Sequence, residues 1–171
     1  MGTTKVVTLL HEDITERIIG TFYAVHRELG SGFLESVYEA ALFLALSDEG
    51  LDVRQQATID VWFRGERVGA FRADLVIAES VIVELKAVRA LVPVHEAQLL
   101  NALRATNIEV GLLLNFGLRP SFKRLVFANN RKKIRDHPRS SAAENTHRHC
   151  GAGLNLEPEL RTEVGEADSK E

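Results

Sequence analysis

The sequence predicts an α/β fold in which helices pack on a mixed sheet, in the order α-α-β-β-β-α-β. Three observations support this prediction. Apolar residues recur at helical spacing in the N-terminal third of the chain, and two β-branched runs surround a polar break near its middle. A continuous apolar run over residues 110–116 follows a third helical pattern, which is typical of a buried strand.

The first two elements are predicted to be helices. Residues 13–29 form an amphipathic pattern that begins at Asp13 as the N-cap and ends at Gly30. A second helix is expected over residues 33–47. We assign its packed face to five residues that follow one stripe: Phe33, Val37, Ala40, Ala41 and Leu44.

Strands and a third helix are expected next. A strand covers about residues 53–63 and ends at a turn centred on Gly65. A hairpin follows it. The third helix begins at Pro93, which suits the first helical position, and runs to about Thr106. Its inward side chains are expected to be Leu99, Leu100 and Leu103.

The hairpin contains the most informative residues of the chain. If residues 78–80 form its loop, the pairing of the two strands places Asp74 directly opposite Glu84. Side chains alternate along a strand, so Lys86 shares the face of Glu84. We therefore expect two carboxylates and one ammonium group on one patch of the sheet.

Two interpretations of this patch are open. Directly opposed carboxylates repel each other by on the order of 3 kcal/mol at an effective dielectric constant near 20. Lys86 would offset part of this repulsion as a counter-ion in a solvated cluster. A divalent cation would offset all of it, and hard carboxylate oxygens suit Mg²⁺ or Mn²⁺. The spacing of the residues alone does not decide between the two.

Composition indicates one soluble domain. The chain has 171 residues, of which 45% are hydrophobic and 26% charged, and its longest apolar stretch, residues 40–46, is far too short to span a bilayer. No secretory signal is evident, and the single Cys150 excludes an internal disulfide, so we expect a cytoplasmic protein without a membrane partner. We expect an N-terminal extension over residues 1–12, a folded domain over 13–128 and a disordered or loosely attached polar tail over 129–171.

The charge balance restricts nucleic-acid binding to local surfaces. A net charge of −3 argues against a strongly basic, nonspecific nucleic-acid binder. The best candidates for a local contact are Lys123 and Arg124, followed by the basic cluster at residues 131–135, which we interpret as part of a solvated tail.

A second group of carboxylates lies on the second helix. Glu35, Tyr38, Glu39 and Leu42 recur at i, i+3, i+4 and i+7 and share a face. This face is either a boundary stripe whose carboxylates point to water or a second acidic contribution to the site.

Several motifs together resemble a known family. Residues 25–39, Val-His-Arg-Glu-Leu-Gly-Ser-Gly-Phe-Leu-Glu-Ser-Val-Tyr-Glu, closely resemble the signature of the bacterial GxxExxY family, which belongs to the PD-(D/E)XK nuclease superfamily. The resemblance spans about residues 13–128 and continues, in the family's order, through residues 73–76, 83–86, 98–101 and 111–117.

The resemblance implies a restriction-endonuclease-like core and a set of site residues. It places three residues on the family signature: Gly32, Glu35 and Tyr38. It places four on the nuclease core and the helix that follows: Asp74, Glu84, Lys86 and Gln98. Ala73 stands where the superfamily's name has Pro, and Ala102 stands where a Gln-x-x-x-Tyr pattern has a ring, so any substrate contact from that ring is absent.

We therefore expect metal-dependent hydrolysis of phosphodiester bonds in nucleic acid, with DNA favoured. Asp74, Glu84 and the backbone carbonyl of Leu85 would bind Mg²⁺ or Mn²⁺, and Glu35 would bind a second ion or act through a water. Nearby carboxylates should raise the pKa of Lys86, so we expect it to orient the nucleophile and stabilise charge and not to act as a general base.

Three further expectations concern Gln98, the oligomeric state and an alternative function. Gln98 either holds the scissile phosphate or the attacking water, or is a polar helix residue without a role. Many small nuclease domains work as dimers, so a homodimer is one option. The alternative function is a catalytically silent nuclease-fold module for binding or assembly.

Overall fold

The structure is a computed structural model that describes residues 10–132. Of the predicted tail over residues 129–171, only 129–132 are described, and they are not loose: Asn129–Arg131 form a 3₁₀ turn, and Lys132 is buried. The rest of the tail and residues 1–9 of the predicted N-terminal extension lie outside the described residues. The elements are α1 (Glu12–Leu29), α2 (Glu35–Asp48), β1 (Val53–Phe63), β2 (Glu66–Ile77), β3 (Val81–Lys86), α3 (Pro93–Ala105), β4 (Val110–Asn115), β5 (Ser121–Val126) and the 3₁₀ turn η1 (Asn129–Arg131). None of the helices in this part of the chain is both long and apolar enough to cross a bilayer.

The strands form one five-stranded mixed sheet in the order β1-β2-β3-β4-β5. β3 and β4 run parallel and are joined through α3, whereas the other neighbouring pairs are antiparallel. The predicted mixed α/β fold is confirmed, and the three predicted helices and the strands predicted at 53–63 and 110–116 agree with the observed ones to within about two residues. The first hairpin strand is longer than predicted, because β2 begins at Glu66, directly after the turn at Gly65. β5 was not predicted, because this edge strand has no buried side chain that would produce an alternating pattern.

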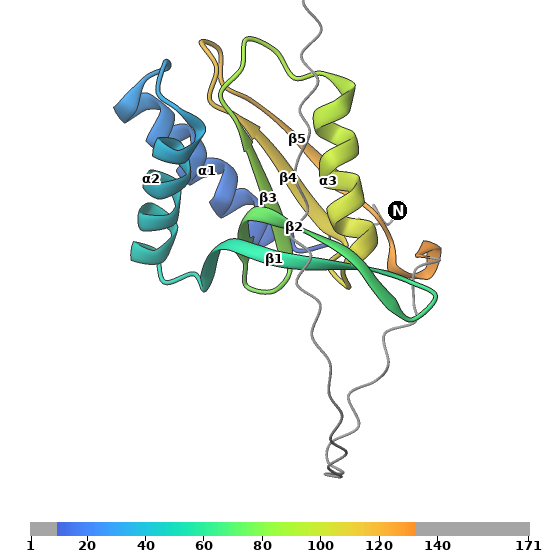
Figure 1. Ribbon diagram of the computed structural model, residues 1–171. Helices are drawn as coiled ribbons and strands as arrows, with labels where there is room; N and C mark the ends of the chain where they lie inside the picture. Colours follow the sequence, from blue (N-terminus) through green and yellow to red (C-terminus); the bar gives the residue numbers. More distant parts are fainter. Residues whose placement is uncertain (1–9, 133–171) are drawn as a thin grey trace, which may run out of the picture. The chain divides into compact units, whose positions relative to one another are not determined.

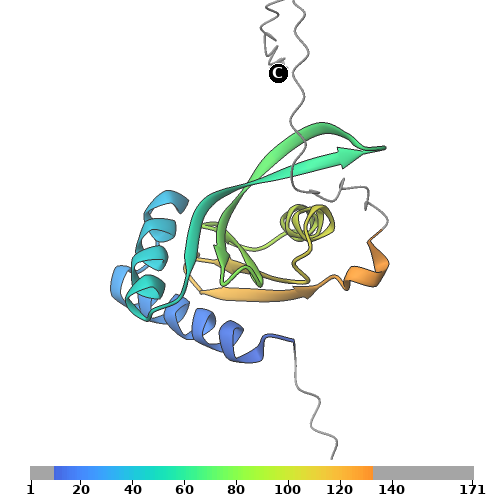
Figure 2. The same ribbon diagram turned by 90° about the horizontal axis from the view of Figure 1, so that it is seen from below.

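Helices cover both faces of the sheet (Figure 1). α1 and α2 pack on one face, where Phe22, Leu42 and Leu112 belong to one hydrophobic cluster. α3 packs on the other face, where Leu99 and Leu103 form a second cluster with strand residues. Seen from below, the long β1–β2 ribbon curves over α3 (Figure 2), so that α3 lies in the concave side of the sheet.

Two local predictions for the helices were wrong. The N-cap of α1 is His11, in the left-handed region at φ 55°, whereas Asp13 lies in the first turn of the helix. The packed face of α2 is formed by Tyr38, Leu42 and Leu46, which are fully buried, and not by the stripe that includes Leu44, which is 61% exposed. This helix is apolar around most of its circumference, so periodicity alone could not identify the buried side.

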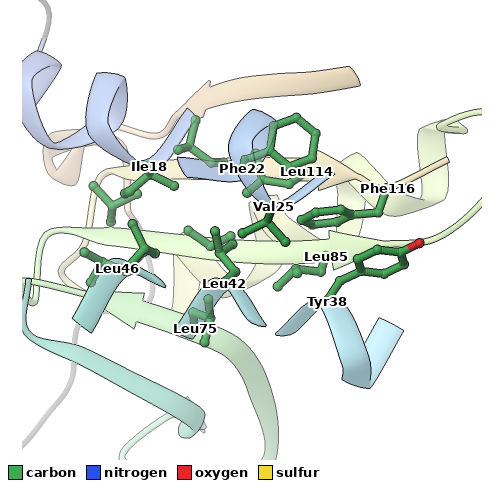
Figure 3. Packing of buried hydrophobic residues seen from close by; sticks show 14 of the residues in the cluster. Ile18, Phe22, Val25, Tyr38, Leu42, Leu46, Leu75, Leu85, Leu114 and Phe116 are labelled. Atoms are coloured by element: carbon green, nitrogen blue, oxygen red, sulfur yellow. The ribbon is translucent and has the colours of Figure 1, made fainter. Parts of the chain in front are cut away.

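Tyr38 fastens the start of α2 to the core. Its ring stacks on that of Phe116, with centroids 4.3 Å apart. Figure 3 shows the two side chains next to each other in the core. Its hydroxyl donates a hydrogen bond to the carbonyl oxygen of Gly30 at 2.8 Å and accepts one from the backbone N–H of Phe33 at 3.2 Å. Between these two residues Gly32 has φ +112°, which strongly favours glycine. Tyr38 therefore holds the turn from α1 into α2 closed.

Replacing Tyr38 with Phe should destabilise the domain by about 1–3 kcal/mol, because it leaves the Gly30 carbonyl and the Phe33 N–H without their partner while keeping the ring stack. Chemical denaturation followed by circular dichroism would measure the change. Tyr23→Phe, on an exposed ring of α1, serves as the control and should have little effect. Equal stability of Tyr38→Phe and the wild type would show that the hydroxyl does not hold the turn.

Candidate active site

The predicted hairpin register is confirmed. β2 and β3 pair as Leu75 with Val83, Val76 with Ile82 and Ile77 with Val81. Ala78 and Glu79 in the loop have φ near +50°, as a tight hairpin turn requires.

The ladder does not continue to Asp74 and Glu84, so these two residues are not a regular cross-strand pair. Instead, the backbone N–H of Leu85 donates a hydrogen bond of 2.7 Å to Asp74 Oδ2. β2 leaves β3 at this level, and the carboxylate of Asp74 takes the place of a strand carbonyl. The candidate site lies at this separation of the two strands.

A change in side-chain direction accompanies the separation. Side chains alternate between the two faces of a sheet, so the odd-numbered residues of β1 and β2 should share one face while the β1–β2 register is unchanged. Val53 and Leu75, however, belong to the cluster beneath α1 and α2. Ala57 and Ala73 belong to the cluster beneath α3. The switch occurs where Gln56 would pair with Asp74, and Gln56 has φ +49°. We call this irregularity the Gln56 kink.

Glu84 and Lys86 form an ion pair beside the separation. Lys86 Nζ lies 2.6 Å from Glu84 Oε1, and the two side chains are only 12% and 16% exposed, so water screens the pair less than a surface ion pair. Burial alone would lower the pKa of Lys86. The hydrogen bond to Glu84 and the charges of Glu84, Glu35 and Asp74 outweigh it, and the pKa of Lys86 is raised. This agrees with the expected role as a cation and argues against a general base.

Glu35, on α2, contacts the residue that directly follows β3. It is the first residue of α2, and its Oε1 accepts a hydrogen bond of 3.2 Å from the N–H of Ala87. The carbonyl of Lys86 accepts from Phe116 N–H, on the β4 side. Backbone groups alternate in direction along a strand, so the Leu85 carbonyl points away from β4, toward the edge where its own N–H meets Asp74.

Burial and like charge act on the two central carboxylates. Burial raises the pKa of Asp74, and Glu35 adds to this effect, while the Leu85 N–H and Lys86 oppose it. Burial also raises the pKa of Glu84, with Asp74 and Glu35 adding to it and Lys86 opposing it. The site therefore gathers negative charge that the chain only partly neutralises.

Glu39 belongs to the same electrostatic group, and no role was predicted for it. It lies one turn after Glu35 on α2, and its Oε2 accepts a hydrogen bond of 2.7 Å from Gln56 Nε2. Burial raises the pKa of Glu39, the bond from Gln56 lowers it, and the charge of Asp74 raises it. Its position on the face of Glu35 was visible in the sequence, whereas its contact with the Gln56 kink was not.

The donor chemistry of this group fits a hard divalent cation. Carboxylate oxygens and a strand carbonyl are the ligands that Mg²⁺ and Mn²⁺ prefer. Burial is the main cause of the raised pKa of Asp74 and Glu84, with like charge adding to it, and a bound cation would oppose both effects. However, no three Asp, Glu, His or Cys side chains within residues 10–132 are gathered closely enough to hold a metal ion as they stand. Instead, the oxygens of Asp74, Glu84 and Glu35 accept hydrogen bonds from Leu85, Lys86 and Ala87.

The other predicted residues lie in two places. Gln98, on α3, lines a cleft together with Glu84, so it faces the candidate site. Lys123 and Arg124 lie on β5 and already have partners: Lys123 forms an ion pair with Glu96, and Arg124 donates to the carbonyl of Leu10. Their contact with nucleic acid remains a prediction.

Comparison with known families identifies the superfamily of the chain. The family model described as the PD-(D/E)XK nuclease superfamily matches residues 12–125, about two thirds of the chain. The chain belongs to the PD-(D/E)XK nuclease superfamily. This match is compatible with the narrower GxxExxY assignment, which remains a prediction.

The remaining comparisons add little to this membership. No protein in the curated comparison matches the chain. One similar solved structure, titled "Crystal structure of SSO0001", is 16% identical with a TM-score of 0.44. The match covers 68% of this chain and 61% of that one, so this nuclease-superfamily chain spans less than two thirds of the length of that relative.

Replacing Asp74 with Asn should raise the melting temperature at pH 7 by roughly 1–4 °C. The pKa of Asp74 is higher in the folded than in the unfolded state, so ionisation at rising pH costs folding stability. An amide cannot ionise, and its oxygen can still accept from Leu85 N–H. The gain should disappear as the pH falls below about 4, where the unfolded carboxyl is also protonated. Thermal melts from pH 3 to 8 would measure this.

The control for that experiment is Asp60→Asn, because Asp60 forms an ion pair with Arg67 on the β1–β2 ribbon and should lose slightly in stability. A lower melting temperature for Asp74→Asn than for the wild type at pH 7 would contradict the raised pKa of Asp74 in the folded state.

Replacing Gln56 with Val should destabilise the domain by about 1–3 kcal/mol, because a β-branched side chain is strained in the left-handed region that this kink requires. Gln56→Gly tolerates the conformation and should cost less, although both variants lose the hydrogen bond to Glu39. Denaturation curves of the two variants would measure the difference. If Val and Gly are equally costly, the backbone conformation is not what stabilises the kink.

Proposed function

We propose that this domain is a metal-dependent nuclease that hydrolyses phosphodiester bonds in nucleic acid, with DNA as the first substrate to test. Membership in the superfamily supports a nuclease-like function and a nucleic-acid substrate. The observation that carries the proposal is the separation of β2 from β3, where Asp74, Glu84 and Lys86 meet in a half-buried setting with excess negative charge.

The residues have distinct roles in this proposal. Asp74, Glu84 and the Leu85 carbonyl would hold Mg²⁺ or Mn²⁺, and Glu35 would approach from the start of α2, directly or through a water. Such an ion, when bound, would supply a water of lowered pKa and neutralise charge on the phosphate. Glu84 would exchange part of its contact with Lys86 for this cation.

Lys86 acts as a charge in this proposal. Its raised pKa keeps it protonated at neutral pH, so it donates hydrogen bonds and stabilises the negative charge that develops on the phosphate oxygens. Gln98, on α3 in the lining of the cleft, would hold the scissile phosphate or the attacking water.

One observation favours a second candidate, a catalytically silent nuclease-fold module. The acidic side chains of the site already accept hydrogen bonds from backbone N–H groups and from Lys86. In the described part of the chain, no three His, Cys, Asp or Glu side chains lie close enough together to bind a metal ion. Such a module would keep its partner after Asp74 is neutralised. The homodimer receives no support from the single chain described, and cytoplasmic location remains a prediction.

Cleavage should require Asp74, Glu84 and Lys86. We expect the full-length protein to cut labelled DNA in Mg²⁺ or Mn²⁺, and Asp74→Asn, Glu84→Gln and Lys86→Ala to lower the rate at least about 100-fold. Each removes a group that holds the cation or stabilises charge on the phosphate. Single-stranded and duplex DNA and RNA should be compared by gel, with Glu66→Gln at the exposed β1–β2 turn as the control.

The outcomes separate the two candidates. Cleavage that persists in Asp74→Asn and Lys86→Ala would indicate another site or a contaminant. Absence of cleavage on every substrate, together with no calorimetric binding of Mn²⁺ by the wild type, would favour the silent module.

A further inference from the structure

A cleft of about 340 Å³ opens beside Glu84. Its lining comes from β2 beyond the point where this strand leaves β3, from β3 itself and from α3: Phe71, Arg72, Glu84, Gln98 and Asn101. The cleft therefore exists because the two strands separate, and it shares one carboxylate with the candidate site.

The lining has the chemistry that a nucleotide needs. Phe71 is half-buried and packs against the hydrophobic cluster beneath α3, so its ring is held in place at the wall of the cleft. Aromatic rings at such positions stack on nucleobases of any sequence. Arg72 is exposed and can pair with a phosphate, and the amides of Gln98 and Asn101 can donate to phosphate oxygens or to base edges.

The volume and the charge of the domain restrict the kind of nucleic acid. A cleft of this size lies at the lower end of the range for small-molecule sites, so it can receive one nucleotide unit but not a double helix. Tight duplex binding depends on many Lys and Arg contacts with phosphates. Residues 10–132 carry 14 Lys and Arg against 16 Asp and Glu, and Lys123 already forms an ion pair with Glu96.

We propose that the cleft is a subsite for one unpaired nucleotide next to the scissile phosphate, so that the substrate is single-stranded nucleic acid. The base lies against the Phe71 ring, Arg72 contacts a phosphate of the same strand, and Gln98 and Asn101 orient the nucleotide. Its place beside the scissile phosphate depends on the proposed function. Recognition of an unpaired strand by the cleft does not, and can be measured without cleavage.

Binding of a fluorescein-labelled 12-nucleotide single strand to the full-length chain in EDTA tests the proposal, because no hydrolysis can intervene. Fluorescence anisotropy should show tighter binding to this strand than to its duplex. Phe71→Leu should weaken binding roughly five- to 160-fold, since it removes the stacking contact with one base while preserving an apolar side chain in the core. Phe71→Trp should restore it.

Arg72→Ala tests the phosphate contact through the salt dependence. Removal of one phosphate contact should lower the slope of log K against log salt by about 0.7 for a single strand. Arg67→Ala is the matched control, because Arg67 lies on the same strand at the far end of the ribbon, where it pairs with Asp60. The control should leave the slope unchanged.

The results separate this inference from the proposed function. Wild-type cleavage with unchanged binding in Phe71→Leu and an unchanged slope in Arg72→Ala would overturn the subsite and leave the nuclease in place. Binding that depends on Phe71 and Arg72 in a protein that cuts nothing would support the subsite and overturn the nuclease. Tighter binding of the duplex than of the single strand would also overturn the subsite.

Discussion

The hydrogen bond from Leu85 N–H to Asp74 makes the rest of the site possible. A strand that leaves its neighbour exposes backbone groups that need partners, and burying them unpaired costs free energy. The carboxylate of Asp74 supplies the acceptor that the departing strand no longer provides. The part of β2 before Leu75 can therefore lie apart from β3 and curve over α3 while the Leu85 N–H keeps a partner. The same side chain thus stabilises the separation of the strands and places negative charge in it.

Apolar packing elsewhere in the fold compensates for the free-energy cost of burying the charges at this site. Burial raises the pKa of Asp74 and of Glu84, so their ionised forms oppose folding. The stacked rings of Tyr38 and Phe116 and the apolar contacts beneath α1 and α2 compensate for this cost (Figure 3). Strain and uncompensated charge of this kind are common where a protein performs chemistry. A cation would remove the repulsion without altering the core.

Some of this arrangement could be read from the sequence, and some could not. The register of the hairpin was predictable because a one-residue slip would move every buried side chain of β3 to the opposite face. The Gln56 kink was not predictable, because residues in the left-handed region are usually Gly or Asn, and Gln gives no indication of this conformation. The register placed Asp74 and Glu84 at the same level, but only the structure shows that the ladder between β2 and β3 ends at Leu75 and that the two strands separate there. The buried face of α2 was hidden for a different reason: Leu42 and Leu44 are equally apolar, and only the contacts with the sheet distinguish them.

The spacing of the family signature has a physical explanation in this structure. Gly32 adopts a backbone conformation that favours glycine, and the chain then enters α2 with Glu35 as its first residue. One turn later, Tyr38 points into the core and its hydroxyl binds back to both sides of that glycine turn. Two structural residues therefore fix the position of one acidic residue between them. The carboxylate of Glu35 can reach Ala87 beyond the end of β3 because the turn and the ring hold its helix in place, and not because of any residue next to it in the site.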